Sequence, residues 1–317
     1  PRYIDTQDEE DLQDIEAHLR GGIPARDVEA LAPYWVVCPS LEGVLFTDNR
    51  PGYLDLAVDK TAIRTTIYGH PEFTAFIAKL NGLFSEWRNR NTTVLKGLQP
   101  GFQPRDVIAA LSEDLLEHYT GQALMDPYEI YQHLMDYWAE TMQDDCYQIA
   151  AAGWKAETYR MIEKDKKGQD KDKGWACDLV PKALIVARYF PDRQADIEAL
   201  QDELEAVTAR LAELEEEEGE EEGIFAELEK VNKASVTARL KETRGLYAVD
   251  NEETREEQAV LEEWLRLSER ETALKKQIKD AGAELDALAY AKYPALSEEE
   301  VRALVVDDKW MTTLEEA

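Results

Sequence analysis

The chain has 317 residues, enough for two domains with buried cores, and a formal net charge of −31. This charge excludes non-specific binding of duplex DNA over the whole surface, because phosphate binding needs clustered lysine and arginine. Cys38, Cys146 and Cys177 lie far apart without a CxxC pair, which excludes a disulfide framework or zinc site and favours a reducing cytoplasm. There is no signal peptide and no apolar run of membrane-spanning length, and the start at Pro1 rather than Met suggests a fragment or processed chain.

The first hundred residues combine short helices, turns and one long helix. An amphipathic turn that includes Ile15 and Leu19 ends at Gly21-Gly22, which is typical of a helix C-terminus. Residues 48–53, DNRPGY, predict a turn, and a possible strand follows from Tyr53 to Val58. A helix is expected over residues 71–94, with its aromatic and aliphatic side chains directed inward.

Residues 110–154 are the most aromatic part of the chain, and we call this segment the hub. Asp126-Pro127 predicts a helix start, with Asp126 as the cap, Pro127 at the first helical position and Glu129 completing a capping box. An apolar stripe follows at helical spacing, which predicts the buried face of an all-helical core; its members are Tyr128, Tyr131, Met135, Trp138 and Met142.

Two strands are expected after the hub, near residues 158–163 and 175–179, joined as a hairpin near 157–179. The loop between them contains five lysines within ten residues: Lys164, Lys166, Lys167, Lys171 and Lys173. Such a loop is either a solvated tip or a finger that contacts DNA phosphates, and three aspartates dilute its charge. The lysines are therefore candidates for DNA contact.

Two heptad patterns in the second half predict a long antiparallel coiled-coil hairpin, which we call the arm. Between them lies the acidic stretch 215–222 and a short helix expected from Lys233 to Lys241. The second pattern also includes Val260, Trp264, a polar Glu271, Ala281 and Leu288. The predicted seam residues are Ile197, Leu200, Leu204, Val207, Leu211, Leu214, Leu267, Leu274, Ile278 and Leu285.

These elements predict a mainly α fold in three parts. Residues 1–191 form a helical globular domain with the small β-hairpin, residues 192–293 form the arm, and residues 294–317 form a C-terminal capping helix. Ser297 and Glu300 predict a capping box at the start of that last helix.

Motifs that would indicate an enzyme are absent from the sequence. It contains no GxGxxG, GxxxxGK[ST], HExxH or GxSxG, and the four histidines are far apart, which favours structural roles. Asp126-Pro127-Tyr128 imitates the Asn/Asp-Pro-Pro-Tyr/Phe loop of amino-methylating DNA enzymes, but it has one proline and is explained by a helix cap. The carboxylate pairs Asp144-Asp145 and Asp307-Asp308 are better explained by caps and turns than by a metal, so no catalytic, cofactor-binding or metal residue is predicted.

Several stretches resemble the C-terminal half of modification (M) subunits of type I restriction–modification systems. They are DLQDIEAHLRGGIP, TTIYGHPEF, ALSEDLLEHY, DPYEIYQHLMDYWAETMQDDCYQIAAAGW, DLVPKALIVARYF and ALVVDDKW, and the resemblance extends from about Tyr3 to Leu314. Such subunits are adenine-N6 DNA methyltransferases that use S-adenosylmethionine. Two of them assemble on one specificity (S) subunit, and restriction (R) subunits add cleavage.

The sequence departs from the family at both ends, and the family's extreme C-terminal helix, beyond Leu314, is not in these 317 residues. The family's cofactor-binding glycine motif and its Asn-Pro-Pro-Phe/Tyr loop belong to an N-terminal domain that is not in these 317 residues, so no catalytic residue is carried over. The resemblance therefore implies a non-catalytic part that serves assembly with the S subunit and DNA clamping, with S-adenosylmethionine bound elsewhere. The alternative is a free-standing acidic coiled-coil interaction protein or DNA mimic, which the charge of −31 suggests.

Overall fold

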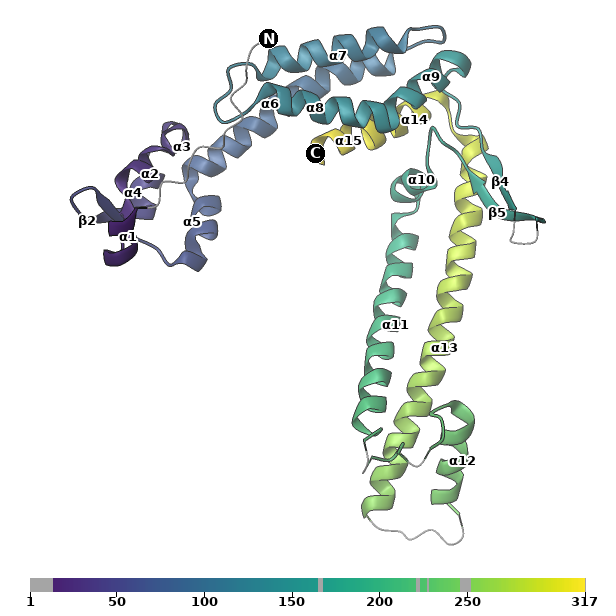
Figure 1. Ribbon diagram of the computed structural model, residues 1–317. Coiled ribbons are helices and arrows are strands. Elements are labelled where there is room, and N and C mark those ends of the chain that lie inside the picture. The colour runs from purple at the N-terminus through teal and green to yellow at the C-terminus, as the bar shows by residue number, and fades with distance from the viewer. Residues whose placement is uncertain (1–13, 165–167, 221–222, 227, 246–251, 317) are drawn as a thin grey trace. The chain divides into compact units, whose positions relative to one another are not determined.

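The structure is a computed structural model, and it describes residues 14–164, 168–220, 223–226, 228–245 and 252–316. These residues are mainly helical with two small antiparallel sheets, which confirms the predicted mainly α fold (Figure 1). The chain divides into unit 1, residues 1–153 and 306–317, and unit 2, residues 154–305. These boundaries differ from the predicted ones at 191 and 293, because the β-hairpin packs on the long helix of the arm and the last residues return to the hub.

Unit 1 begins with a three-stranded antiparallel sheet among short helices. The strand order is β1 (Ile23–Pro24), β3 (Tyr53–Leu56), β2 (Phe46–Arg50), so the strand expected after Tyr53 is present and ends at Leu56. The surrounding helices are α1 (Ile15–Arg20), α2 (Ala25–Glu29), α3 (Ala32–Val37), α4 (Leu41–Leu45), a 3₁₀ turn (Lys60–Ala62) and α5 (Ile63–Gly69). A small core under the sheet contains Cys38, Leu41 and Leu45.

The hub and the helices beside it form the larger part of unit 1. Its helices are α6 (Pro71–Lys96), α7 (Pro104–Tyr119), α8 (Pro127–Tyr137), a π-helical turn (Trp138–Met142) and α9 (Gln143–Ala152). The Asp126 carboxylate caps α8 by accepting a hydrogen bond from the Tyr128 N–H (2.8 Å). Two histidines have structural roles, since His70 caps α6 and His118 Nε2 donates to the Leu83 carbonyl (2.8 Å).

The last residues of the chain belong to the same unit as the hub. A second π-helical stretch (Ala303–Met311) leads into the short helix α15 (Thr312–Glu316). From Val306 onward these residues are part of unit 1. The core of the hub is therefore built from residues 110–154 and from residues after 305, which lie more than a hundred residues apart in the sequence.

Unit 2 contains the hairpin, the arm and the turns that follow it. Its elements are β4 (Tyr159–Lys164), β5 (Asp170–Ala176), α10 (Lys182–Tyr189), α11 (Pro191–Glu217), α12 (Lys233–Thr243), α13 (Glu252–Lys292), a 3₁₀ turn (Tyr293–Ala295) and α14 (Glu298–Arg302). The predicted capping box is present, because Ser297 and Glu300 each bond to the other's backbone N–H. The short helix expected from Lys233 is α12, which Asn232 caps.

Candidate functional site

Helices α11 and α13 lie side by side and run in opposite directions (Figure 1). Glu203 of α11 accepts two hydrogen bonds of 2.6 Å from Arg270 of α13. Arg193, earlier on α11, pairs with Glu284, which is later on α13. Arg210, later on α11, pairs with Glu263, which is earlier on α13. At 1.5 Å per residue, the 27 residues of α11 span about 40 Å. The arm is thus an antiparallel helix pair.

The predicted seam residues face between the two helices. Each of the ten is buried or half-buried; the fully buried ones are Ile197, Leu211, Leu214, Leu267, Leu274 and Leu285. Two further positions of the second heptad pattern, Leu288 and Val260, need correction. Leu288 is 37% exposed, and the next residue, Ala289, is buried instead. At the other end, Leu261 is fully buried, whereas the predicted Val260 is half-buried. The stretch from 221 to 222 in the acidic segment lies outside the described residues.

The end of the arm far from the hairpin has a hydrophobic core of its own. α12 packs there against α13, and the core joins side chains from both arm helices with those of the connecting segment; its buried members are Leu211, Leu214, Phe225, Val236, Leu240, Leu261, Trp264 and Leu267. The Trp264 indole N–H donates to the Glu215 carboxylate (2.9 Å), which satisfies the one polar group of that side chain. This core fixes the fold-back point of the arm.

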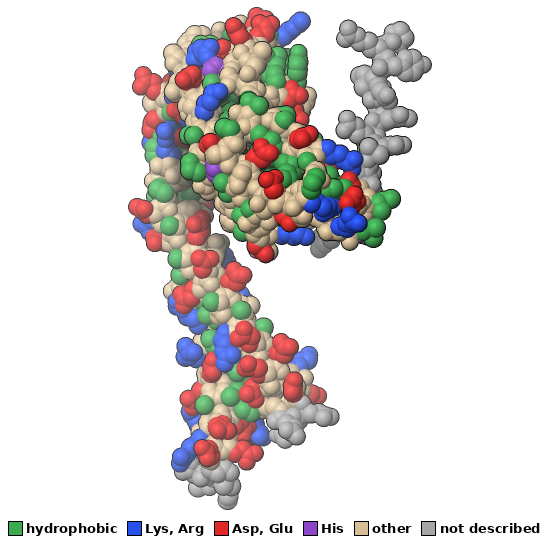
Figure 2. Space-filling view, turned by 90° about the vertical axis from the view of Figure 1, so that its left-hand side faces the viewer, with side chains coloured by type: hydrophobic (Ala, Val, Ile, Leu, Met, Phe, Trp, Pro, Cys, Tyr) green, Lys and Arg blue, Asp and Glu red, His purple; other side chains and the backbone are tan. Residues whose placement is uncertain are grey.

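Charged side chains of both signs cover the arm (Figure 2). Several glutamates are paired with arginines of a neighbouring helix: Glu203 with Arg270, Glu263 with Arg210 at 3.2 Å, and Glu257 with Arg239 at 2.5 Å. Such surface pairs add little stability individually, but they disfavour other registers of the two helices. Part of the acidic charge that the sequence places here is therefore paired with arginines of a neighbouring helix.

Three of the five lysine candidates lie on the strands β4 and β5. Lys164, Lys171 and Lys173 are exposed on these strands, while Lys166 and Lys167 lie outside the described residues. Lys173 is paired with Glu163 (3.1 Å), and Lys164 stands opposite Asp170 in the strand register. From 160 to 173 there are six basic and four acidic residues, so the hairpin has only a modest positive excess.

Trp175 attaches the hairpin to the end of α13. Its ring lies 5.3 Å from that of Tyr290 and 5.2 Å from that of Tyr293, measured between centroids, and its indole N–H donates to Asp286 (3.0 Å). Although partial burial raises the pKa of Asp286, the bonds from Lys182 and Trp175 lower it overall. This packing explains why the hairpin belongs with the arm rather than with the preceding helices.

The predicted aromatic stripe of the hub is only partly buried. Trp138 and Met142 are in the core as expected, but Tyr128 is 72% exposed, which corrects the prediction of a continuous buried face. Leu134 and Cys146 complete the buried face instead, and neither was in the predicted stripe. The π-helical turn after Tyr137 contains one residue more than an α-helical turn. The side chains that follow are therefore rotated about the helix axis relative to the predicted stripe.

Asp145 is the most deeply buried carboxylate among the described residues of unit 1 and is 4% exposed. It accepts hydrogen bonds from Lys309 Nζ (2.9 Å) and from the indole N–H of Trp310 (2.8 Å). Burial raises the pKa of Asp145 and outweighs the opposing effect of Lys309. Asp307 pairs with Lys96 (2.5 Å), and no metal-binding group is found among the residues that the structure describes. One carboxylate of each pair, Asp145 or Asp307, thus helps to attach the C-terminal segment, rather than serving as the predicted cap or turn residue.

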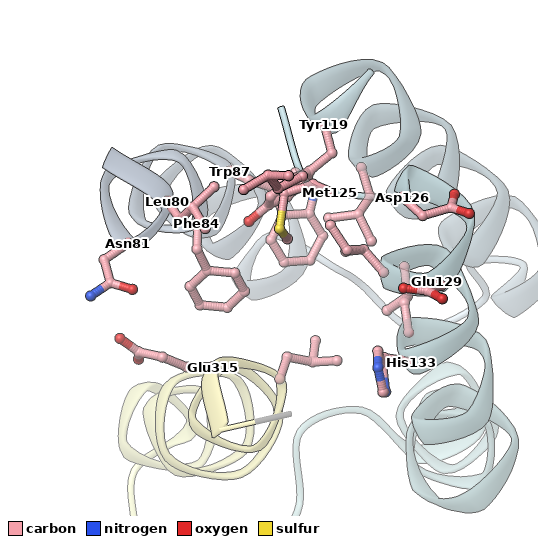
Figure 3. Close-up of a pocket in the computed structure, with 15 residues that line it drawn as sticks. Leu80, Asn81, Phe84, Trp87, Tyr119, Met125, Asp126, Glu129, His133 and Glu315 are labelled. Carbon is pink, nitrogen blue, oxygen red and sulfur yellow. The ribbon is translucent and has the colours of Figure 1, made fainter. Parts of the chain in front are cut away.

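A half-open cavity of about 330 Å³ lies between α6, the consecutive helices α7 and α8, and the C-terminal helix α15. Figure 3 shows Phe84 and Trp87 of α6 on one side, Glu129 and His133 of α8 on the other, and Glu315 on a third. Sequence reasoning missed this cavity, because its walls come from three segments far apart in the chain.

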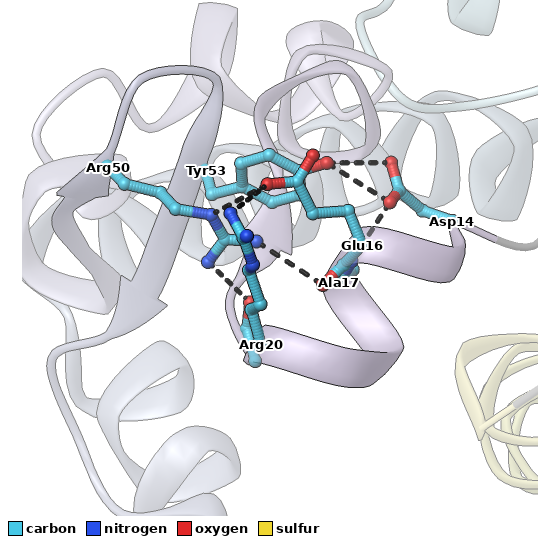
Figure 4. Close-up of polar contacts among 7 residues, drawn as sticks. Asp14, Glu16, Ala17, Arg20, Arg50 and Tyr53 are labelled. Atoms are coloured by element: carbon cyan, nitrogen blue, oxygen red, sulfur yellow. Dashed lines mark hydrogen bonds and ion pairs between the residues drawn. The ribbon is translucent and has the colours of Figure 1, made fainter.

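A polar cluster connects α1 to the sheet (Figure 4). The Tyr53 hydroxyl donates to Asp14 (3.1 Å), Arg50 donates to the Gly21 carbonyl (2.6 Å), and the Arg50 guanidinium stacks 3.7 Å from the centre of the Tyr53 ring. The N–H of Ala17, with further help from Tyr53, lowers the pKa of Asp14. The cluster attaches a helix that has no buried residue of its own.

No family model, curated protein or solved structure matches this chain. Among the described residues, no helix combines the length and apolar character needed to cross a bilayer.

Proposed function

We propose that this chain is the non-catalytic C-terminal part of a modification subunit of a type I restriction–modification system. In this proposal it assembles with a specificity subunit, a second modification subunit and a restriction subunit, and helps to clamp DNA. The assembled complex would methylate adenine N6 with S-adenosylmethionine bound outside these residues. The choice of this family rests on the sequence resemblance from about Tyr3 to Leu314.

The observation that carries the proposal is the arm. It is a helix pair with an apolar seam along its length and a second core at its far end, built from residues of unit 2 alone. Helix pairs of this kind are typical protein-interaction elements, because they present long rigid surfaces whose charged positions select partners. An assembly role therefore suits the geometry better than chemistry on a small substrate.

The acidic charge alone would also suit a DNA mimic, but the arm argues against it. A mimic needs carboxylates that are free to replace phosphates, whereas Glu203, Glu257 and Glu263 are paired with arginines of a neighbouring helix. Pairing of this kind lowers the density of free negative charge on the surface. We therefore retain assembly as the proposed function.

Co-expression with the specificity subunit from the same genome tests the proposal. The chain should remain bound to an affinity-tagged specificity subunit, and light scattering should give two chains for each specificity subunit. The specificity subunit of an unrelated type I system is the matched control and should not retain it. A folded chain that elutes alone in both cases would contradict the proposal.

A calorimetric titration with S-adenosylmethionine tests the non-catalytic assignment separately. The isolated chain should give no heat of binding, since the proposal places the cofactor outside these residues. An affinity in the micromolar range would show that the chain contains a cofactor site and would overturn this part of the proposal.

A further inference from the structure

Helices α7 and α8 of unit 1 lie side by side (Figure 1), and an open groove follows the line of contact between them. Its apolar lining consists of Ile108, Ala109 and Leu116 from α7 and Tyr128, Tyr131 and Met135 from α8. All of these side chains are at least partly exposed, and Tyr128 is 72% exposed. Three members of the predicted stripe therefore line this groove.

The length and composition of the groove suit a helix from another protein chain. From Arg105 to Leu116 the groove follows α7 for about three helical turns, roughly 16 Å at 1.5 Å per residue. Tyrosine and methionine are enriched where proteins bind one another, and a helix laid in an apolar groove is a common mode of recognition. The groove is therefore a candidate protein-binding surface.

Two charged side chains stand beside the apolar lining, one of each sign. Arg105 and Glu113 are both exposed, and neither side chain makes a salt bridge or hydrogen bond to a described residue. They lie four residues before and four residues after Ala109, so the three side chains form one row along α7. The row has a cation at one end, an anion at the other and a small residue in the middle.

This row is complementary to the same row of a second copy that runs in the opposite direction. Around a twofold axis at Ala109, Arg105 of each copy lies opposite Glu113 of the other, and the small side chain of Ala109 lets the two helices approach closely. In the commonest class of helix packing, rows with four-residue spacing on the two helices lie alongside one another. A parallel pairing would instead place Arg105 opposite Arg105, which the like charges disfavour.

We infer that a second copy of this chain occupies the groove, with the two α7 helices antiparallel about Ala109 and the α8 helices beside them. The charges of the lining then cancel, although the net charge of −31 on each chain opposes association. Because the interface is also small, the dimer should be weak, with a Kd of about 10–100 µM. At about 1 µM the chain should be monomeric, so unfolding measurements at that concentration report on the monomer.

Charge reversal tests both the interface and its direction. Sedimentation equilibrium of the isolated chain from about 1 to 300 µM measures the Kd. Arg105→Glu alone and Glu113→Arg alone should each weaken the dimer about tenfold or more, because each places like charges opposite one another. The double variant restores both pairs with the signs exchanged, so its Kd should lie within about threefold of the parent value.

A mixture of the two single variants is the most specific form of this test. The Arg105→Glu chain has glutamate at both ends of the row, and the Glu113→Arg chain has arginine at both ends, so each should bind the other but not itself. Energy transfer between differently labelled chains measures this heterodimer. Glu117→Arg is the matched control: it makes the same charge change at an exposed position of α7 outside the lining and should leave the Kd unchanged.

The position of the axis is tested with cysteine. Because the two copies of Ala109 meet at the axis, Ala109→Cys should give a disulfide-linked dimer on mild oxidation. Ala110→Cys is the control, since this exposed position is turned by about 100° around the same helix and should give none. The three native cysteines are buried.

Three outcomes would overturn the inference. A chain that remains monomeric at about 300 µM would leave the groove to a different protein. A mixture of the single variants that does not associate would exclude the antiparallel row as the interface. Equal weakening by Glu113→Arg and Glu117→Arg would trace the effect to net charge instead. None of these results bears on complex formation with a specificity subunit, so the two proposals fail separately.

Discussion

In the arm, buried side chains recur every three or four residues along two continuous helices, and each helix covers the other. In the hub, helix α8 passes into a π-helical turn, and the core is completed by residues 306–311 at the other end of the chain. The arm is therefore stabilised by a pattern repeated along neighbouring positions, and the hub by single long-range interactions. This difference determines how each part should respond to substitution.

The hub should respond strongly to substitution at buried members of the stripe and weakly at exposed ones. Trp138→Ala should lower the free energy of unfolding by about 3–5 kcal/mol, because it removes a buried ring from a packed core. Tyr128→Ala, at 72% exposure on the same predicted face, is the matched control and should change it by no more than about 0.5 kcal/mol. Denaturant titration measures both, and equal effects would show that the stripe is buried throughout.

The arm should respond to removal of a seam side chain, but only locally. Leu274→Ala should cost about 2–5 kcal/mol and speed hydrogen exchange in α11 and α13, while exchange in α6–α9 stays unchanged. Leu288→Ala is the control on the same helix, because that side chain is 37% exposed. Faster exchange spreading equally through the hub would show that the two regions unfold together.

The hairpin lysines are predicted to act in the assembled complex rather than in the isolated chain. Replacing Lys164, Lys166, Lys167, Lys171 and Lys173 with alanine should flatten the dependence of DNA affinity on salt. The expected change in slope is about 0.9 log units for each DNA phosphate that the hairpin no longer neutralises. Sequence preference should be unchanged, since interactions with base edges determine it.

Lys276→Ala with Lys279→Ala is a control for the loss of exposed lysines away from the hairpin, because both lysines are exposed on α13. It should leave the salt dependence unaltered. An unchanged slope in the five-lysine variant would show that the hairpin is a solvated tip that does not contact DNA phosphates.

Glu300 is expected to give a smaller, pH-dependent effect at the base of the arm. The N–H of Ser297 and the bonds from Lys292 and Tyr189 lower its pKa from 4.5 to about 2. A lowered pKa stabilises the folded state above pH 4.5, and this contribution is lost as pH falls from 4.5 to about 2. The melting temperature of Glu300→Gln should fall below that of the parent at neutral pH, and the two should converge over this acidic range.

Elements with a local signature could be predicted from the sequence. The Ser297 capping box, the hairpin and the seam from Ile197 to Leu285 depend on residues a few positions apart, and the structure places them as the pattern indicates. The phase change after Tyr137 could not be predicted, because a π turn leaves no distinct pattern in one sequence.

Interactions between distant segments were not predictable either. The bonds from Lys309 and Trp310 to Asp145 join positions 164 and 165 residues apart. The cavity beside Trp87 has walls from three such segments, so its lining could not be derived from spacing.

Cysteine cross-linking tests most directly the claim that the arm is an antiparallel pair within one chain. Glu203→Cys with Arg270→Cys places thiols at the paired positions of α11 and α13, and the three native cysteines are buried. A short bismaleimide should join them within one chain, while Glu203→Cys with Glu284→Cys, out of register by about fourteen residues of α13, should not react across the pair. A cross-linked dimer from the first variant, or equal intramolecular yield from both, would contradict the account.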